Sequence, residues 1–395
     1  MSTVAAPQGH RRRFHLPALS GRQRFALTAA LVVLAAIVPP TIFDQGSRPM
    51  DIAVLCAAYA CMALGLNIIV GFAGLLDLGY VAFFAIGAYT MGYFGSGFWN
   101  QAGNGEGVSL FVGQPASDLP GYHFNFLIVL VIAVFATTIA GMLIGLPTLR
   151  LRGDYIAIVT LAFGEIIGRI ALNGDDLPVL GKVTAGRQGI TPVDKIDLPF
   201  TERFQALDLR PWYWFALAMV VLVLFVNFRL RDSRLGRAWI ALREDEVAAA
   251  SMGVPLVRTK LLAYGTGAAF GGMSGAFLAS YLNTVNADQF LFSFSIFILA
   301  MIILGGLGSI MGVVLGAITL TIINFYLIPD VLNQKPREWF NLDFELAQLN
   351  FGIFGFLLVI MMVLRPEGLL PERRRQMELE EGIGGDDAIV ETRVP

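Results

Sequence analysis

Two ionisable side chains inside an apolar stretch are the first residues of this sequence that could do chemistry. Glu165 and Arg169 lie four residues apart in the run 154–172, so on a helix they share a face and can pair. An ionisable pair is costly in hydrocarbon and is a functional candidate by default. We expect Glu165 to face the interior of a helix bundle and to contribute to a solute path. A neutralising pair that fixes helix packing, or one near a membrane surface, explains these residues equally well.

A second group of polar residues interrupts another apolar stretch. Residues 71–79 read GFAGLLDLG, so Gly74 and Asp77 lie in a glycine-rich segment that Tyr80 follows. Irregular backbone at membrane depth occurs only where protein or water satisfies its polar groups. Interrupted helices often build the solute path of a transporter near the membrane midplane. We predict a break between two helices here, with Gly74, Asp77 and Tyr80 along the path.

Motifs for catalysis, nucleotide binding and metal binding are absent from the sequence. It has no GxxxxGK(S/T) loop, no HExxH and no GxSxG, its three histidines are dispersed, and its two cysteines, Cys56 and Cys61, share one apolar run. Buried packing is the better interpretation of these cysteines. We therefore expect no metal, no cofactor and no catalysis in this chain.

The composition makes the lipid bilayer the solvent of most of the chain. Of the 395 residues, 56% are hydrophobic and only 15% are charged, and the mean hydropathy is +0.67. A helix needs about 20 mostly apolar residues to cross roughly 30 Å of hydrocarbon. The net charge of −2 gives no reason to expect a nucleic-acid partner. The sequence therefore predicts an all-α integral membrane protein surrounded by membrane lipid.

About ten apolar runs are the expected transmembrane helices, some of them interrupted or re-entrant. They lie at about 25–43, 52–70, 79–95, 124–146, 154–172, 212–230, 260–282, 290–305, 309–328 and 350–364. The chain then divides into a basic N-terminal segment at 1–24, a transmembrane domain at 25–365 and a tail at 366–395. This tail is acidic and glycine-rich, and we expect it to be disordered.

Basic residues in the connections predict the orientation of the chain. Lys and Arg are retained on the cytoplasmic side of the membrane, and they concentrate before the first run, around 229–260 and after the last run. Both termini and the segment 231–258 should therefore be cytoplasmic in a multi-pass protein of the bacterial inner (plasma) membrane. The connection at 173–211 contains Lys and Arg but is expected to be periplasmic, because long loops translocate with less regard to charge.

The cytoplasmic segment 231–258 has the composition of a helix of its own. We predict a helix from about Leu235 to Met252, which ends at Gly253 because glycine tolerates a left-handed conformation at a helix end. Its charged cluster and small residues could enter a cleft in a partner, and a solvated amphipathic loop helix is the alternative. The candidate contact residues are Arg243, Glu244, Asp245, Glu246, Ala248, Ala249 and Gly253.

Glycines at four-residue spacing mark two later apolar runs. One set is Gly267, Gly271 and Gly275, and the other is Gly308, Gly312 and Gly316. On a helix each set forms a smooth stripe against which another backbone can pack. We predict helix packing for both sets rather than contact with a solute.

The segment 231–258 resembles the coupling helix of ABC-importer permeases, the short cytoplasmic helix that docks on the ATPase subunit. The resemblance is closest to branched-chain amino-acid permeases of the LivM type. The general importer pattern places Glu-Ala-Ala before a glycine-containing turn. Here Val247, Ala248 and Ala249 precede the turn at Gly253 at that spacing, with the glutamate displaced to Glu246.

Four further motifs resemble the same family and occur in the same order along nearly all of the chain after the first run. Residues 71–79 are similar to its early glycine-rich break, with Asp77 and Tyr80 where the family more usually has Ser and His. Residues 184–190 resemble its Thr-Gly-Gly-x-x-Gly-Ile loop, with Ala in place of the first Gly. The segments 304–309 and 365–369 match as well.

This resemblance implies the ABC-importer permease fold and a subunit that translocates leucine, isoleucine, valine or a related solute. It also implies that Thr184, Gly186 and Gly189 belong to the solute path. The implied partners are a second, related permease, two cytoplasmic ATP-binding subunits and a periplasmic substrate-binding protein. Four alternatives stay open. They are a urea or short-amide ABC permease, which Asp77 and Tyr80 make harder to exclude, a ribose-type sugar permease, a stand-alone secondary transporter or channel, and a membrane-embedded enzyme.

Overall fold

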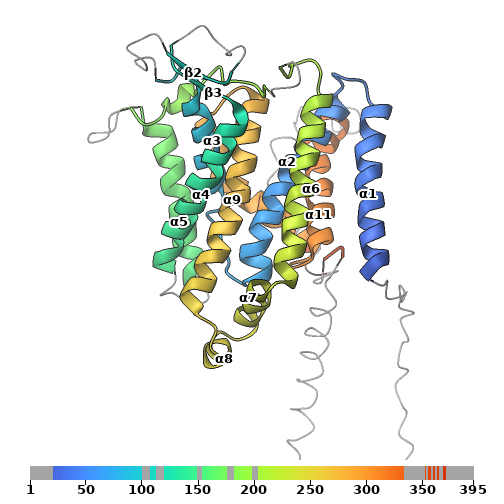
Figure 1. The fold of residues 1–395 in the computed structure, drawn as a ribbon, viewed down its shortest axis with the longest axis vertical. Helices are drawn as coiled ribbons and strands as arrows, with labels where there is room; N and C mark the ends of the chain where they lie inside the picture. The colour runs from blue at the N-terminus through green and yellow to red at the C-terminus, as the bar shows by residue number, and fades with distance from the viewer. Residues whose placement is uncertain are drawn as a thin grey trace, which may run out of the picture.

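The computed structural model describes residues 21–99, 107–112, 120–148, 154–175, 182–197, 203–332, 352, 355–356, 359–360, 363 and 368–370. Most of this part of the chain is helical, and the longer helices lie along the long axis of the molecule (Figure 1). The segment 1–20, the tail beyond 370 and most of the expected span at 350–364 lie outside the described residues.

The described part of the chain contains both long and short helices. The longer ones are α1 (Gly21–Ile42), α2 (Arg48–Asn67), α3 (Val81–Phe94), α4 (Phe126–Thr148), α5 (Asp154–Asn173), α6 (Arg210–Asp232), α9 (Leu256–Leu282), α10 (Phe292–Gly305) and α11 (Ile310–Ile322). Short helices α7 (Arg234–Glu244) and α8 (Glu246–Ser251) lie together at the bottom of Figure 1, which we call the α7–α8 end. Among the described residues, η3 (Gly186–Gln188) and η4 (Ala287–Phe290) are 3-10 turns, and η1 (Ile68–Phe72) and η5 (Ile323–Leu332) are π-helical segments.

Five helices of the described residues are long and apolar enough to cross a membrane. They are Arg48–Phe72, Phe126–Thr148, Tyr155–Asn173, Arg210–Asp232 and Ile310–Val331, while Val81–Phe94 and Phe292–Gly305 are apolar but shorter. In Arg48–Phe72, 94% of the most apolar stretch is buried, against 22% in Phe126–Thr148. The fold is therefore that of a helical membrane protein with α2 near its centre, and the number of ten spans stays a prediction.

Glycines let α9 approach α2 and α3 closely. A Cβ added to Gly267 would lie 2.9 Å from the carbonyl oxygen of Gly65, and one at Gly275 would clash with the carbonyl oxygen of Phe84. A Cβ at Gly271 would lie 3.1 Å from the Tyr80 ring. Such small residues allow backbones to pack where lipid provides no hydrophobic driving force. The three predicted glycines thus lie at helix contacts.

The second set of glycines is divided between a turn and a helix. Gly312 and Gly316 on α11 face α10, where added Cβ atoms would clash with the carbonyl oxygens of Gly305 and Met301. Gly308 instead precedes α11 and has a φ of +84°. This left-handed conformation favours glycine. The predicted helical stripe therefore includes Gly312 and Gly316 but not Gly308, which lies in the turn before α11.

The predicted break in the early helices is present. α2 continues as a π-helical turn through Phe72, residues 73–80 are not helical, and α3 begins at Val81. A second break separates α10 from α11, and it contacts the end of α2 because the Gly308 N–H donates to Oδ1 of Asn67 at 3.0 Å. In a continuous helix such an N–H group would bond within the helix. At this break it bonds to a neighbouring helix instead and so holds the two helices together.

The expected helix over 235–252 is two helices, which is a correction. Asp245 lies between α7 and α8 with an extended backbone, at φ −153° and ψ 111°. Its Oδ1 accepts hydrogen bonds from the N–H groups of Val247 and Ala248 at 2.8 and 3.0 Å. Aspartate is a preferred N-cap because it satisfies free N–H groups at a helix start. The charged cluster therefore ends one helix and begins the next.

A small sheet at the end opposite α7 and α8 departs from the all-α prediction. It has the order β1 (Gly95–Ser96), β3 (Tyr122–Phe124), β2 (Val108–Leu110), with β1 antiparallel and β2 parallel to β3 (Figure 1). The buried side chains of His123 and Asp194 join this sheet to the loop at 182–197 after α5, with Nδ1 and Oδ2 2.7 Å apart. Strands this short carry no periodic pattern, so the sequence did not reveal them.

Candidate functional site

The α7–α8 end presents an exposed tip that could contact a partner. Val247 and Met252 are 65% and 85% exposed, and apart from its two chain neighbours no described residue has an atom within 4 Å of a Cβ added to Gly253. Glu244, Asp245 and Ala248 are also exposed, whereas Ala249 is buried. The predicted contact residues therefore divide into a group that faces outward and a group, with Arg243 and Glu246, that lies against the rest of the protein.

Arg243 connects α7 directly to the break after α2. Its Nη1 donates a hydrogen bond to the carbonyl oxygen of Gly71 at 2.7 Å. Gly74, which has a φ of +69°, lies so close to this side chain that a Cβ would clash with it. Trp239 anchors the same helix, because it is buried and its Nε1 donates to the carbonyl oxygen of Thr259 at 2.8 Å. A displacement of α7 would therefore reach both the break and α9.

An ion pair joins α8 to α9 on the inner side of the tip. Nζ of Lys260 lies 2.7 Å from Oε1 of Glu246, and the side chains are 3% and 30% exposed. Together with Gly74, Leu76 and Arg243 they line a cavity of about 210 Å³. A buried lysine needs a partner because an unpaired buried charge is strongly unfavourable. Glu246 and Lys260 are 14 positions apart in the sequence, so only the structure shows that they pair.

Asp77 and Tyr80 lie inside the bundle. Oδ1 of Asp77 accepts from the N–H of Gly79 at 2.8 Å, while its Oδ2 has no hydrogen-bond partner among the described residues. The Tyr80 hydroxyl donates to the carbonyl oxygen of Gly267 at 2.9 Å. Thr160 of α5 accepts from the N–H of Leu78 at 3.0 Å. The break is thus tied to both α9 and α5.

Thr184, Gly186 and Gly189 lie far from Asp77, at the end opposite α7 and α8. The Thr184 hydroxyl donates to the carbonyl oxygen of Ala171 at 3.0 Å and accepts from the N–H of Gly186 at 3.2 Å. Gly186 and Gly189 have φ values of +55° and +70°. The loop therefore closes the end of α5. The structure brings these three residues together with one another, and not with the break.

Glu165 lies on the outside of the bundle, which corrects the expectation that it faces the interior. Glu165 and Arg169 are both exposed on α5. Among the described residues, neither side chain takes part in an ion pair or hydrogen bond. The inner side of α5 is occupied by small residues instead, and a Cβ at Gly164 would lie 3.1 Å from Cα of Gly79. The helical period placed the pair on one face but did not say which way that face points.

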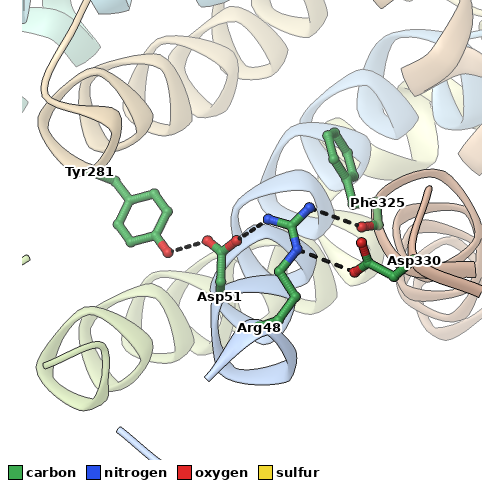
Figure 2. A network of polar contacts seen from close by, with 5 residues as sticks. All are labelled: Arg48, Asp51, Tyr281, Phe325 and Asp330. Carbon is green, nitrogen blue, oxygen red and sulfur yellow. Dashed lines mark hydrogen bonds and ion pairs between the residues drawn. The ribbon is translucent and has the colours of Figure 1, made fainter. Parts of the chain in front are cut away.

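A polar network that sequence reasoning missed joins α2, α9 and η5 at the end opposite α7 and α8 (Figure 2). Arg48 donates to Oδ2 of Asp51 at 3.0 Å and to Oδ2 of Asp330 at 3.3 Å. The Tyr281 hydroxyl donates to Oδ1 of Asp51 at 2.5 Å. Arg48 also donates to the carbonyl oxygen of Phe325 at 3.4 Å. These residues are up to 282 positions apart, so no local sequence motif indicates the network.

The family of the chain follows from comparison with known proteins. A family model described as "Branched-chain amino acid transport system / permease component" matches residues 48–363. The high-affinity branched-chain amino acid transport system permease protein LivM of Salmonella typhimurium is 37% identical over 94% of this chain and 81% of its own length, and LivM of Escherichia coli is 38% identical over the same shares. The permease protein LivH of Salmonella typhimurium is 32% identical over 43% of this chain and 49% of its own length. No solved structure matches the chain. The chain therefore belongs to the family of permease components of branched-chain amino acid transport systems.

Proposed function

We propose that this chain is the permease subunit of an ABC importer that moves leucine, isoleucine, valine or a related amino acid across a bacterial inner membrane. The names of its LivM relatives support this substrate class. ATP would be hydrolysed by separate subunits. The observation that carries the mechanism is the hydrogen bond from Arg243 to Gly71, because it links the exposed tip to the interrupted helices at the bundle centre.

The proposed assembly contains three kinds of partner subunit. A second, related permease would complete the transmembrane part, and the partial likeness to LivH supports a hetero-dimer. Two cytoplasmic ATP-binding subunits would dock on the α7–α8 end, and a periplasmic substrate-binding protein would deliver the solute to the other end. This orientation places both termini in the cytoplasm and uses about ten spans with membrane lipid around them.

The proposed mechanism transmits motion through contacts between helices. The ATP-binding subunits would press on the tip around Val247, Met252 and Gly253. Trp239 and Arg243 hold α7 against α9 and the break, so movement of the tip would shift the segment with Gly74, Asp77 and Tyr80. The break also contacts α5 through Thr160. The helices would then exchange an outward-facing path for an inward-facing one.

The test of this function uses the complex with its ATP-binding subunits and binding protein in proteoliposomes. Val247→Asp with Met252→Asp should abolish ATP-driven leucine uptake and weaken co-purification with the ATP-binding subunits, because charges would replace an exposed apolar contact. Leu207→Asp is the matched control for co-purification with the ATP-binding subunits, since Leu207 is 83% exposed in a loop at the opposite end. Normal uptake by the double variant contradicts docking at this tip.

The same preparation separates the alternative functions. Uptake without the ATP-binding subunits would identify a stand-alone transporter or channel. Uptake of urea in place of leucine, with a binding protein that prefers urea, would identify a short-amide permease. ATP-driven uptake of leucine is the outcome that we expect.

A further inference from the structure

The outer face of α5 carries charges where a lipid-facing helix carries none. Its exposed positions recur every three to four residues and include Tyr155, Ile158, Glu165, Arg169 and Asn173. This spacing describes one continuous stripe along the helix. The stripe thus combines apolar side chains with a carboxylate, a guanidinium and an amide.

Glu165 lies at membrane depth in this stripe. The helix runs from Asp154 to Asn173, a length of 20 residues. At about 1.5 Å per residue this length corresponds to roughly 30 Å, the thickness of the hydrocarbon core. Glu165 lies just past the middle of the helix. A charge at this depth is costly in lipid and almost always faces protein or a water-filled cavity.

The exposed stripe of the neighbouring helix α4 differs in composition from the exposed stripe of α5. Val131, Phe135, Ile139 and Leu143 are exposed at strict four-residue spacing, and all are apolar. The exposed large side chains of α6 include Val221, Leu222 and Phe225, which are also apolar. The α5 stripe is therefore unlike the surfaces of these two helices, and its composition is unsuited to lipid.

The inner face of α5 is connected to the break between α2 and α3. Thr160 accepts the hydrogen bond from Leu78, and Gly164 packs on Gly79. Arg243 holds the other side of the same break through Gly71. A movement that starts at α7 therefore has a continuous route of packed contacts to the helix that bears Glu165.

We propose that the outer face of α5 lines the aqueous solute path, and that Glu165 and Arg169 hold the ammonium and carboxylate groups of the amino acid. This inference rests on the proposed function. A carboxylate complements an ammonium group, and a guanidinium binds a carboxylate in a bidentate manner. Neither side chain is engaged by another described residue, so both charges are available to a zwitterion. The exposed Ile158 and Ile166 supply apolar surface for an aliphatic side chain.

Water access to this face is tested with cysteine variants of the assembled complex. The native Cys56 and Cys61 are buried, so their background reaction with a charged, membrane-impermeant thiol reagent should be low. Glu165→Cys should be labelled, whereas the matched control Ile139→Cys on the apolar stripe of α4 should not. Leucine, delivered by the binding protein, should slow the labelling at position 165. Absence of labelling in the complex, or labelling that leucine leaves unchanged, overturns the proposal.

Transport assays test the two charges directly. Glu165→Gln and Arg169→Gln should each lower ATP-driven leucine uptake about tenfold or more, the effect of losing roughly one strong charged contact, while the subunits still co-purify. Glu165→Asp should retain more uptake than Glu165→Gln. Uptake by Glu165→Gln equal to that of the unsubstituted complex overturns the inference and leaves the proposed function standing. Failure of the unsubstituted complex to take up leucine overturns the proposed function, and the labelling experiment then still decides whether α5 lines an aqueous path.

Discussion

Arg243 is the residue through which the exposed tip reaches the core of the protein. Its hydrogen bond to the carbonyl oxygen of Gly71 satisfies a backbone acceptor at the start of an irregular segment. The sequence indicated Arg243 as a partner-facing residue because it stands in a charged cluster. The structure instead places its side chain against Gly74 within the same chain, so its proposed role is to transmit motion rather than to dock.

Substitution of Arg243 should separate ATP hydrolysis from transport. Arg243→Ala removes a half-buried charged hydrogen bond worth about 1–2 kcal/mol, which corresponds to roughly a tenfold loss of uptake. Uptake and ATP hydrolysis by the reconstituted complex measure the effect. Arg237→Ala is the control, because Arg237 is exposed on the same helix and, among the described residues, its side chain donates only to the carbonyl oxygen of Asp232. Equal uptake by the two variants contradicts a coupling role.

The pair of Lys260 and Glu246 should respond unequally to the loss of each partner. Glu246→Ala leaves a lysine that is 3% exposed without its carboxylate, whereas Lys260→Met leaves a glutamate that is 30% exposed to water. Breaking a fully buried pair lowers the free energy of unfolding by about 3–5 kcal/mol. Because Glu246 is partly exposed, we expect a loss of about 1–3 kcal/mol for this pair. We therefore expect Glu246→Ala to lower the Tm in detergent more than Lys260→Met does. The reverse order would show that Lys260 is hydrated.

At the scale of elements, the break and the glycine contacts decide how the helices pack. α9 lies against α2 and α3 because glycines stand where side chains would meet backbone oxygens. The sequence located these glycines by their period, since small residues at four-residue spacing form a helix-packing stripe. It did not locate their partners, because the facing residues belong to helices far away in the chain.

A methyl group at two glycines should have very different effects on stability. Gly275→Ala places a Cβ against the backbone of Phe84, which cannot move without shifting α3, and overpacking of this kind costs about 1–3 kcal/mol. Gly145→Ala meets side-chain atoms of Tyr264 at 3.1 Å, which can adjust. Thermal unfolding in detergent should therefore show a lower Tm for Gly275→Ala than for Gly145→Ala. Equal Tm values would argue against close backbone contact between α9 and α3.

The joint between α7 and α8 should depend on the Asp245 carboxylate. Asp245→Ala removes the acceptor for the N–H groups of Val247 and Ala248, and loss of such a cap costs about 1 kcal/mol. α8 has only six residues, so its proteolytic sensitivity should rise and uptake should fall. Asp245→Asn keeps an acceptor oxygen and should behave like the unsubstituted protein. A similar loss in both variants would assign the role to the charge rather than to the cap.

At the scale of the whole molecule, the two ends differ in structure and in proposed environment. One end carries the α7–α8 tip, and the other carries the small sheet, the loop with Thr184 and the network around Arg48 (Figures 1 and 2). Arg48 is 54% exposed, so its ion pairs are expected to contribute only about 0–1 kcal/mol each. The orientation of these ends in the membrane is a prediction from the basic residues.

Cysteine labelling from each side of the membrane measures that orientation. Met252→Cys should react with an impermeant reagent only when the reagent has access to the cytoplasmic face of the membrane. Leu207→Cys should react only when the reagent is applied to the periplasmic face. Both positions are well suited, because Met252 and Leu207 are 85% and 83% exposed. Reaction of both from one side contradicts the proposed topology.

The sequence by itself determined the membrane environment, the apolar runs, the break at 71–79 and the family, because composition, local period and motif order are properties of the chain. Only the tertiary structure decided that Arg243 faces Gly71, that Lys260 pairs with Glu246 and that Glu165 and Arg169 point outward. A helical period shows which residues share a face, but the direction of that face depends on which other helices pack beside it. The sequence predicted an interior position for Glu165, whereas the structure places it on the outer surface of α5. At this surface a solute path and a second permease could contact Glu165.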